Sequence, residues 1–210
     1  MIRHSFWFVL LFLTIVIGAC SSVSTNQPTG IQANTPQDAA QIVMQVITDL
    51  DKKSSSQRED LVQIFDENGV RFCPYYRTES TDRILTVDQF LEEFEDPNAT
   101  PVLWGIQDGS GDPIEMNLRE YWQRYVWDQP YHTLSTPHVV NTPDDFQGQG
   151  NMINNLLDMY APPQYRIVEY YQPGQNPAYN GMDWTSLILV FRNDNNLWKL
   201  VAIAHGSWTI

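Results

Sequence analysis

The sequence has only two cysteines and few basic residues. Cys20 and Cys73 are the two thiols among 210 residues, so a framework of disulfides is excluded. Twelve Lys and Arg stand against 25 Asp and Glu, which gives a formal net charge of −13 at pH 7. No basic cluster is present, and a protein that neutralises nucleic-acid phosphates needs one. We therefore expect no nucleic-acid partner, and the acidic balance favours neutral or cationic ligands.

The sequence also lacks the motifs of the common catalytic and cofactor sites. It contains no GxSxG, no P-loop, no Rossmann fingerprint, no HExxH and no CxxC. None of the histidines has a second histidine four residues away, the spacing that places two zinc ligands on one helix face. We expect no cofactor and no zinc site.

One long apolar run is present, at the N-terminus. Arg3 precedes the run Phe6–Ile17, which is shorter than the ~20 residues that a membrane span needs. The run leads into Ile17-Gly18-Ala19-Cys20, which resembles the bacterial lipobox. We expect residues 1–19 to be a lipoprotein signal peptide and Cys20 to carry the lipid. An ordinary signal peptide with a chance cysteine, or a short anchor, is the alternative.

A lipidated Cys20 implies a location. Each buried CH₂ contributes about 0.8 kcal/mol, so a diacylglyceryl group with an N-acyl chain such as palmitate anchors a protein stably. We expect a cell-envelope lipoprotein on the extracytoplasmic side of a membrane, with the membrane as its partner through Cys20. Residues 20–34 are rich in Ser, Thr, Asn and Gln and are typical of a flexible tether. Residues 35–210 then form a single domain.

The first part of this domain is helical in pattern. Apolar residues recur at helical spacing after the capping pair Thr35-Pro36, and two capping boxes begin later helices at Thr86 and Asn117. Gly69 is expected as the C′ residue of the second helix. The predicted helices cover residues 36–50, about 57–68, 87–94, 118–125 and 151–160.

The last part is strand-like. Expected strands are 70–76, 139–140 and 165–172, followed by a hairpin in Asp183–Ile210 around the turn Asn193–Asn196, and residues 102–106 are a short apolar stretch. Both faces of the final strand are apolar, which predicts a covered strand inside the sheet. Strict alternation places Trp198, Leu200, Ala202 and Ala204 on one face and His205 on the other. The pattern is α+β: N-terminal helices packed on a curved, mainly antiparallel sheet with a C-terminal meander.

Two resemblances accompany this pattern. The long N-terminal helix and the three-strand meander resemble the NTF2-like cone, a curved sheet wrapped on helices. Five stretches also resemble a family of uncharacterised bacterial secreted proteins and lipoproteins whose chains end in HxxWTI. The stretches are GVRFxPY from Gly69, WGxxDGSGDPI from Trp104, VEYYxPG from Val168, GMDWxSL from Gly181 and HxxWTI from His205. This family resemblance implies secretion and a single domain, and it implies no activity.

The aromatic share of 12%, with 7 Trp and 10 Tyr, fits either a core of large rings or an aromatic-lined pocket. We expect a non-catalytic domain that binds a small molecule, a cell-envelope ligand or a partner through Tyr75, Trp104, Glu169, Asp183 and His205. The alternative is an NTF2-like enzyme of hydrolase or isomerase type, in which His205 acts with Asp183. An enclosed cavity shared by the two side chains would favour the enzyme, and a packed His205 would favour a structural role.

Two further groups have structural and functional interpretations. The sequence from Asp108 to Asp112, DGSGD, resembles the start of a calcium loop, but Pro113 and Arg119 occupy the positions where an EF-hand has Gly and Glu. We expect a tight glycine-rich turn, with a weak cation site at Asp108 and Asp112 as the alternative. Cys73 lies in a strand-like run and is expected to be a buried, inert thiol.

Overall fold

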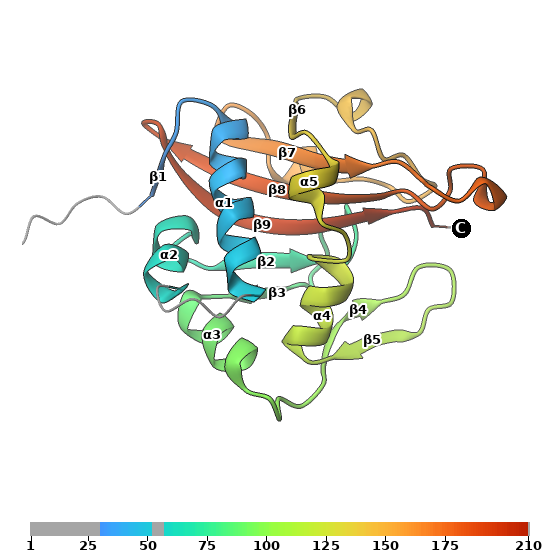
Figure 1. Cartoon of the computed structure of the whole chain (residues 1–210), viewed down its shortest axis with the longest axis horizontal. Helices are drawn as coiled ribbons and strands as arrows, with labels where there is room; N and C mark the ends of the chain where they lie inside the picture. The colour runs from blue at the N-terminus through green and yellow to red at the C-terminus, as the bar shows by residue number, and fades with distance from the viewer. Residues whose placement is uncertain (1–29, 52–56, 210) are drawn as a thin grey trace, which may run out of the picture.

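The computed structural model describes residues 30–51 and 57–209, which form an α+β fold (Figure 1). The predicted signal peptide, Cys20 and most of the predicted tether lie outside the described residues. Within the described part of the chain, no helix combines the length and apolarity that a membrane span requires.

The centre of the fold is a mixed, mainly antiparallel sheet in the order β3-β2-β9-β8-β7-β6, with the short β1 also paired to β9. The parallel pair is β2 with β9, and the other pairs are antiparallel. The last strand therefore lies inside the sheet, as predicted. A separate hairpin of β4 and β5 completes the strands. Their bounds are β1 Ile31–Gln32, β2 Val70–Cys73, β3 Arg83–Leu85, β4 Val102–Ile106, β5 Pro113–Met116, β6 His138–Val140, β7 Tyr165–Gln172, β8 Thr185–Asp194 and β9 Leu197–Ser207.

The helices begin where the sequence predicts caps. The Thr86 hydroxyl accepts the Gln89 N–H while the Gln89 side chain accepts the Thr86 N–H, and Asn117 and Glu120 repeat this capping box. The helical elements are α1 Pro36–Asp51, α2 Gln57–Ile64, α3 Val87–Glu95, α4 Leu118–Tyr125, α5 Tyr131–Leu134, α6 Leu156–Met159 and the 3₁₀ turns η1 Pro143–Asp145 and η2 Pro177–Tyr179.

Two helix predictions were too long. The helix expected over residues 151–160 is confined to Leu156–Met159, because the Asn155 side chain accepts the N–H of Thr78 and donates to its carbonyl instead of continuing a helix. The second helix ends at Ile64, so Gly69 is not its C′ residue. Gly69 instead has φ +96° in the turn before β2, where a Cβ would lie 2.9 Å from the backbone of Leu85.

The two faces of the sheet are covered differently. Helices α1 to α5 cover one face, with a core that includes Phe72, Phe90 and Leu189 (Figure 1). Loops and the short α6 cover the other face, where Phe146 and Trp184 are among the buried rings. We refer to these as the helix face and the loop face.

A β-bulge corrects the predicted faces of β9. The partners in β8 are Val190 for Ala202 and Phe191 for Leu200, so Val201 is the extra residue. Leu200 and Trp198 pack in the helix-side core, whereas Ala202 and Ala204 pack in the loop-side core. The prediction that these four share one face was therefore wrong. Periodicity alone does not reveal a bulge, which shifts every later residue by one position.

Candidate functional site

Three of the five predicted ligand-binding residues belong to one column of aromatic rings on the helix side. Trp104 stacks on Tyr121 with ring centroids 3.9 Å apart, and Tyr121 leads to Tyr125 at 5.0 Å. Tyr125 contacts both Tyr75, at 6.4 Å, and His205, at 5.6 Å. Trp104 is fully buried and its indole N–H donates to the Met116 carbonyl at 2.8 Å. Along this column the large rings form packed core.

His205 lies at the end of this column and is paired with a carboxylate. It is 6% exposed, and its Nε2 lies 3.2 Å from Oδ2 of Asp128, just after α4. The other oxygen of Asp128 accepts the Tyr131 hydroxyl at 2.8 Å. An ionised carboxylate only accepts, so opposite an ionised Asp128 the Nε2 atom is the donor, and in the neutral form of the ring Nδ1 then has the lone pair. That Nδ1, like the Tyr125 hydroxyl, is buried and has no hydrogen-bond partner among the described residues.

Asp183, the acid expected to act with His205, has another role. One of its oxygens accepts the N–H groups of Gln175 and Asn176, at 2.9 and 2.8 Å. These two donors, opposed by slight burial, lower the pKa of its carboxyl. Asp183 thus fixes the loop between β7 and β8, and the acid that contacts His205 is Asp128.

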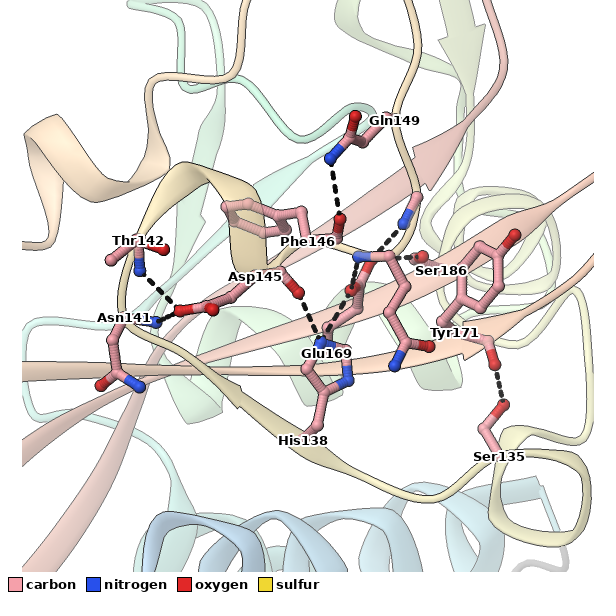
Figure 2. Close-up of polar contacts among 12 residues, drawn as sticks. Ser135, His138, Asn141, Thr142, Asp145, Phe146, Gln149, Glu169, Tyr171 and Ser186 are labelled. Carbon is pink, nitrogen blue, oxygen red and sulfur yellow. Dashed lines mark hydrogen bonds and ion pairs between the residues drawn. The ribbon is translucent and has the colours of Figure 1, made fainter.

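Glu169 lies on the opposite, loop face of the sheet and is fully buried (Figure 2). Its carboxylate accepts the Ser186 hydroxyl at 2.6 Å and the N–H groups of Gln147 and Gly148 at 2.8 and 3.3 Å. His138 Nε2, on β6, lies 3.2 Å from the same carboxylate. Four donors therefore converge on one buried acid, which is the condition under which a buried charge is tolerated.

His138 belongs to this cluster because β6 pairs with β7 in a register that places His138 opposite Glu169. Its Nε2 also lies 2.9 Å from the carbonyl oxygen of Asp145. The hydrogen bond to Glu169 raises the pKa of His138, against the opposing effect of burial. In this arrangement the acid bonds the serine directly and the histidine does not bridge the two, so the cluster is not a nucleophilic triad.

A groove on the helix side runs between α1 and the segment from α5 to β6. Its volume is about 360 Å³, and Tyr170 lines it. Tyr170 belongs to β7, the strand next to the edge strand β6. It is 2% exposed, and its hydroxyl has no hydrogen-bond partner among the described residues. Burial alone raises the pKa of this phenol. Most of the other lining residues carry neutral amides or hydroxyls: Gln41, Gln45, Thr48, Ser135 and Thr136. His132, Met44 and Pro137 complete the lining.

Asp108 and Asp112 form a tight turn. The Asp108 N–H donates to the Tyr75 hydroxyl at 3.1 Å, the Asp112 N–H donates to Ser110 Oγ at 3.3 Å, and the Gln107 N–H donates to the Asp112 carbonyl at 2.7 Å. No group of three or more His, Cys, Asp or Glu side chains suited to a metal ion occurs within residues 30–51 and 57–209.

Cys73 is buried and free, and burial raises the pKa of its thiol well above the usual value. Its sulfur donates to Asp82 at 3.4 Å. A protonated, inaccessible thiol is a poor nucleophile, so Cys73 has the properties of a structural residue.

Sequence reasoning missed four residues of these sites: Asp128, Tyr131, His138 and Tyr170. The long-range contacts of Asp128 and Tyr170 arise from tertiary packing, which local spacing does not encode. For His138, the alternation of β7 together with a paired β6 would have placed it beside Glu169.

The chain matches no protein-family model, no curated protein and no solved structure.

Proposed function

We propose that this protein is an extracytoplasmic lipoprotein whose domain binds an uncharged, hydrogen-bonding ligand in the groove between α1 and the α5–β6 segment. The observation that carries the proposal is that Tyr170 lines the groove and that its buried hydroxyl has no hydrogen-bond partner among the described residues. An unpaired buried hydroxyl costs about 1–3 kcal/mol, a cost that a ligand group or an ordered water removes.

The lining of the groove supports an uncharged ligand. The described residues that line it include no Asp, Glu, Lys or Arg, although the chain as a whole is strongly acidic. Amides and hydroxyls from Gln41, Thr48 and Thr136 offer both donors and acceptors, whereas a cationic ligand would find no carboxylate there and an anionic ligand would find no Lys or Arg. The volume of about 360 Å³ is at the low end of the range of about 300–1,000 Å³ for small-molecule sites. Neutral saccharides and short neutral peptides have this chemistry.

We also propose that the architecture of this domain is the NTF2-like cone. Helix α1 lies across the sheet and β7, β8 and β9 form a C-terminal meander, which supports the resemblance (Figure 1). The groove lies between α1 and the α5–β6 segment, and Tyr170 is the residue of the meander that lines it.

Binding is tested with a thermal-shift screen of neutral N-acetylated oligosaccharides and neutral oligopeptides beside charged analogues. A ligand at 100 times its Kd should stabilise the domain by about 2.7 kcal/mol. Tyr170→Phe should weaken the binding of any neutral hit, whereas Tyr165→Phe, on the same strand but outside the groove, should not. Hits that are all charged, or that bind Tyr170→Phe as tightly as wild type, would contradict the proposal.

The lipid anchor is tested separately. Cys20→Ser should abolish incorporation of labelled fatty acid and leave the precursor unprocessed, because the thiol is the acyl acceptor. Labelling that persists in the variant would contradict the lipoprotein assignment and would leave the proposal of ligand binding in the groove unaffected.

A second candidate function is general-base catalysis by His205. The specific observation is that Asp128 contacts one ring nitrogen while the other has no hydrogen-bond partner among the described residues, which is the arrangement of a histidine oriented by an acid. Binding remains the first proposal because His205 does not line the groove. A screen with chromogenic esters decides between them: hydrolysis that wild type shows and His205→Gln lacks would favour the enzyme, and absence of turnover would favour binding.

A further inference from the structure

A ten-residue segment, Asn141–Gly150, crosses the loop face of the sheet and is held there by side chains of the cluster in Figure 2. We name this segment the strap. At its start, one carboxylate oxygen of Asp145 accepts the N–H groups of Asn141 and Thr142, both at 2.8 Å. Toward its end, Glu169 accepts two further backbone N–H groups. Asp145 belongs to the strap, so its two bonds close a turn within the strap, and the carboxylate that ties the strap to the sheet is Glu169.

The strap lies directly on buried aromatic rings. A Cβ at Gly148 would come within 2.3 Å of the Trp184 ring, and a Cβ at Gly150 would come within 2.7 Å of the Tyr76 hydroxyl. The Tyr76 and Trp184 rings stack with centroids 6.3 Å apart. The strap also forms part of the wall of a cavity of about 240 Å³ beside Tyr76. Release of the strap would therefore expose two large rings and open this cavity.

One of the contacts between the strap and the sheet is made by a titratable side chain, that of His138. His138 lies between two acceptors, the Glu169 carboxylate of β7 and the Asp145 carbonyl oxygen of the strap itself. The charged groups that face its ring are the carboxylates of Glu169 and Asp145, both negative, and both contribute attraction to its cation. Ser186, on β8, is neutral. Helix α1 packs on the other face, where Val139 points.

We propose that the strap is a pH-responsive cover, held against the sheet by the cationic form of His138 and loosened when His138 loses its proton. In the cation, one N–H bridges the buried carboxylate of Glu169 and the strap carbonyl with full charge. The neutral ring keeps the N–H but loses the charge, so Glu169 retains only neutral donors.

The direction of the effect follows from linkage. The pKa of His138 is raised in the folded protein above 6.5, first by the hydrogen bond to Glu169. The stabilisation is therefore fully present below pH 6.5 and is lost as pH rises through the folded pKa. The Nδ1 atom is buried without an acceptor among the described residues, so the gain comes from the Nε2 side alone.

Hydrogen exchange at single amides, measured on the full chain in detergent at pH 6 and pH 8.5 and corrected for intrinsic rates, tests the proposal. The amides of Gln147 and Gly148 should lose protection several-fold at the higher pH. The amides of Gln175 and Asn176 are an internal control, because the carboxylate of Asp183 accepts them and no histidine of the described residues bonds to that carboxylate. Their protection should not change.

Variants complete the test. His138→Gln should make the protection of Gln147 and Gly148 equal at the two pH values, whereas His132→Gln, outside the cluster, should leave the wild-type response. Protection of the strap amides that does not depend on pH, or that falls equally at Gln175 and Asn176, overturns the proposal. These readouts need no ligand, so their failure does not depend on the fate of the groove.

Discussion

Two histidine–carboxylate pairs lie on opposite faces of the same sheet, and each has a nitrogen-to-oxygen distance of 3.2 Å. On the helix face the histidine is the buried partner: the His205 side chain is 7% exposed and that of Asp128 is 18% exposed. On the loop face the order is reversed, with the Glu169 side chain 1% exposed and that of His138 25% exposed. The two pairs share their distance and differ in which member is buried.

This difference determines what each pair does for the fold. A buried carboxylate must collect donors, and Glu169 collects two backbone N–H groups that fix the strap as well as one hydroxyl. A partly exposed acid needs fewer donors, and Asp128 has one tyrosine hydroxyl and one imidazole. The pair with the buried acid therefore organises backbone, whereas the other orients a histidine ring.

The largest expected effect comes from removing the buried acid. Glu169→Ala leaves the Ser186 hydroxyl and the two strap N–H groups without an acceptor in the interior. Breaking a buried pair in this way typically costs about 3–5 kcal/mol, which corresponds to a fall in Tm of roughly 10 °C at this size. Thermal melts of Glu169→Ala and the isosteric Glu169→Gln check it. The glutamine variant should fall less, and an unshifted midpoint for Glu169→Ala would contradict the role of the carboxylate.

Replacing the acid by its amide on the helix face should cost less than the same change at Glu169. Asp128→Asn keeps one acceptor oxygen, and the site is partly open to solvent, so a loss of about 1 kcal/mol and a fall in Tm of about 2–4 °C are expected. Glu169→Gln is the equivalent acid-to-amide change on the loop face, so the falls in Tm of these two variants can be compared directly. If Asp128→Asn destabilises the domain more than Glu169→Gln, burial of the acid is not what separates the two pairs.

The effect of pH separates the pairs further. Because the folded pKa of His138 is raised by Glu169, the stability that wild type has over His138→Gln should be full below pH 6.5 and shrink as pH rises through the folded pKa. Urea unfolding of both proteins across pH 5.5–9 measures this difference. A difference that grows with pH would show that the neutral ring, not the cation, is the form that the fold favours.

Much of the fold could be predicted from local chemistry, whereas the two histidine–carboxylate pairs could not. Capping boxes at Thr86 and Asn117 depend on residues three positions apart, and the hairpin turn depends on Asn195 and Asn196, both of which have positive φ. Such features are complete within a short stretch of sequence. His205 with Asp128 joins residues 77 positions apart, and which face His205 occupies depends on the bulge at Val201. Cross-strand register and bulges arise from packing, so the acid paired with His205 was predicted as Asp183.

The smallest expected effect concerns a buried polar group that no residue of the described chain satisfies. Tyr170 is 2% exposed and Glu169 is 0% exposed, so both residues are buried. The Tyr170 hydroxyl has no hydrogen-bond partner among the described residues, whereas four donors contact the Glu169 carboxylate. Tyr170→Phe removes only that hydroxyl and leaves the ring packing intact. Deleting an unpaired buried polar group is nearly neutral or stabilising, so Tm should stay within about 2 °C of wild type or rise. Melts of Tyr170→Phe beside Glu169→Gln make the comparison directly. A fall as large as that of Glu169→Gln would mean that the Tyr170 hydroxyl is held by ordered water as firmly as Glu169 is held by the strap, and the groove would then lose the feature that favours a ligand.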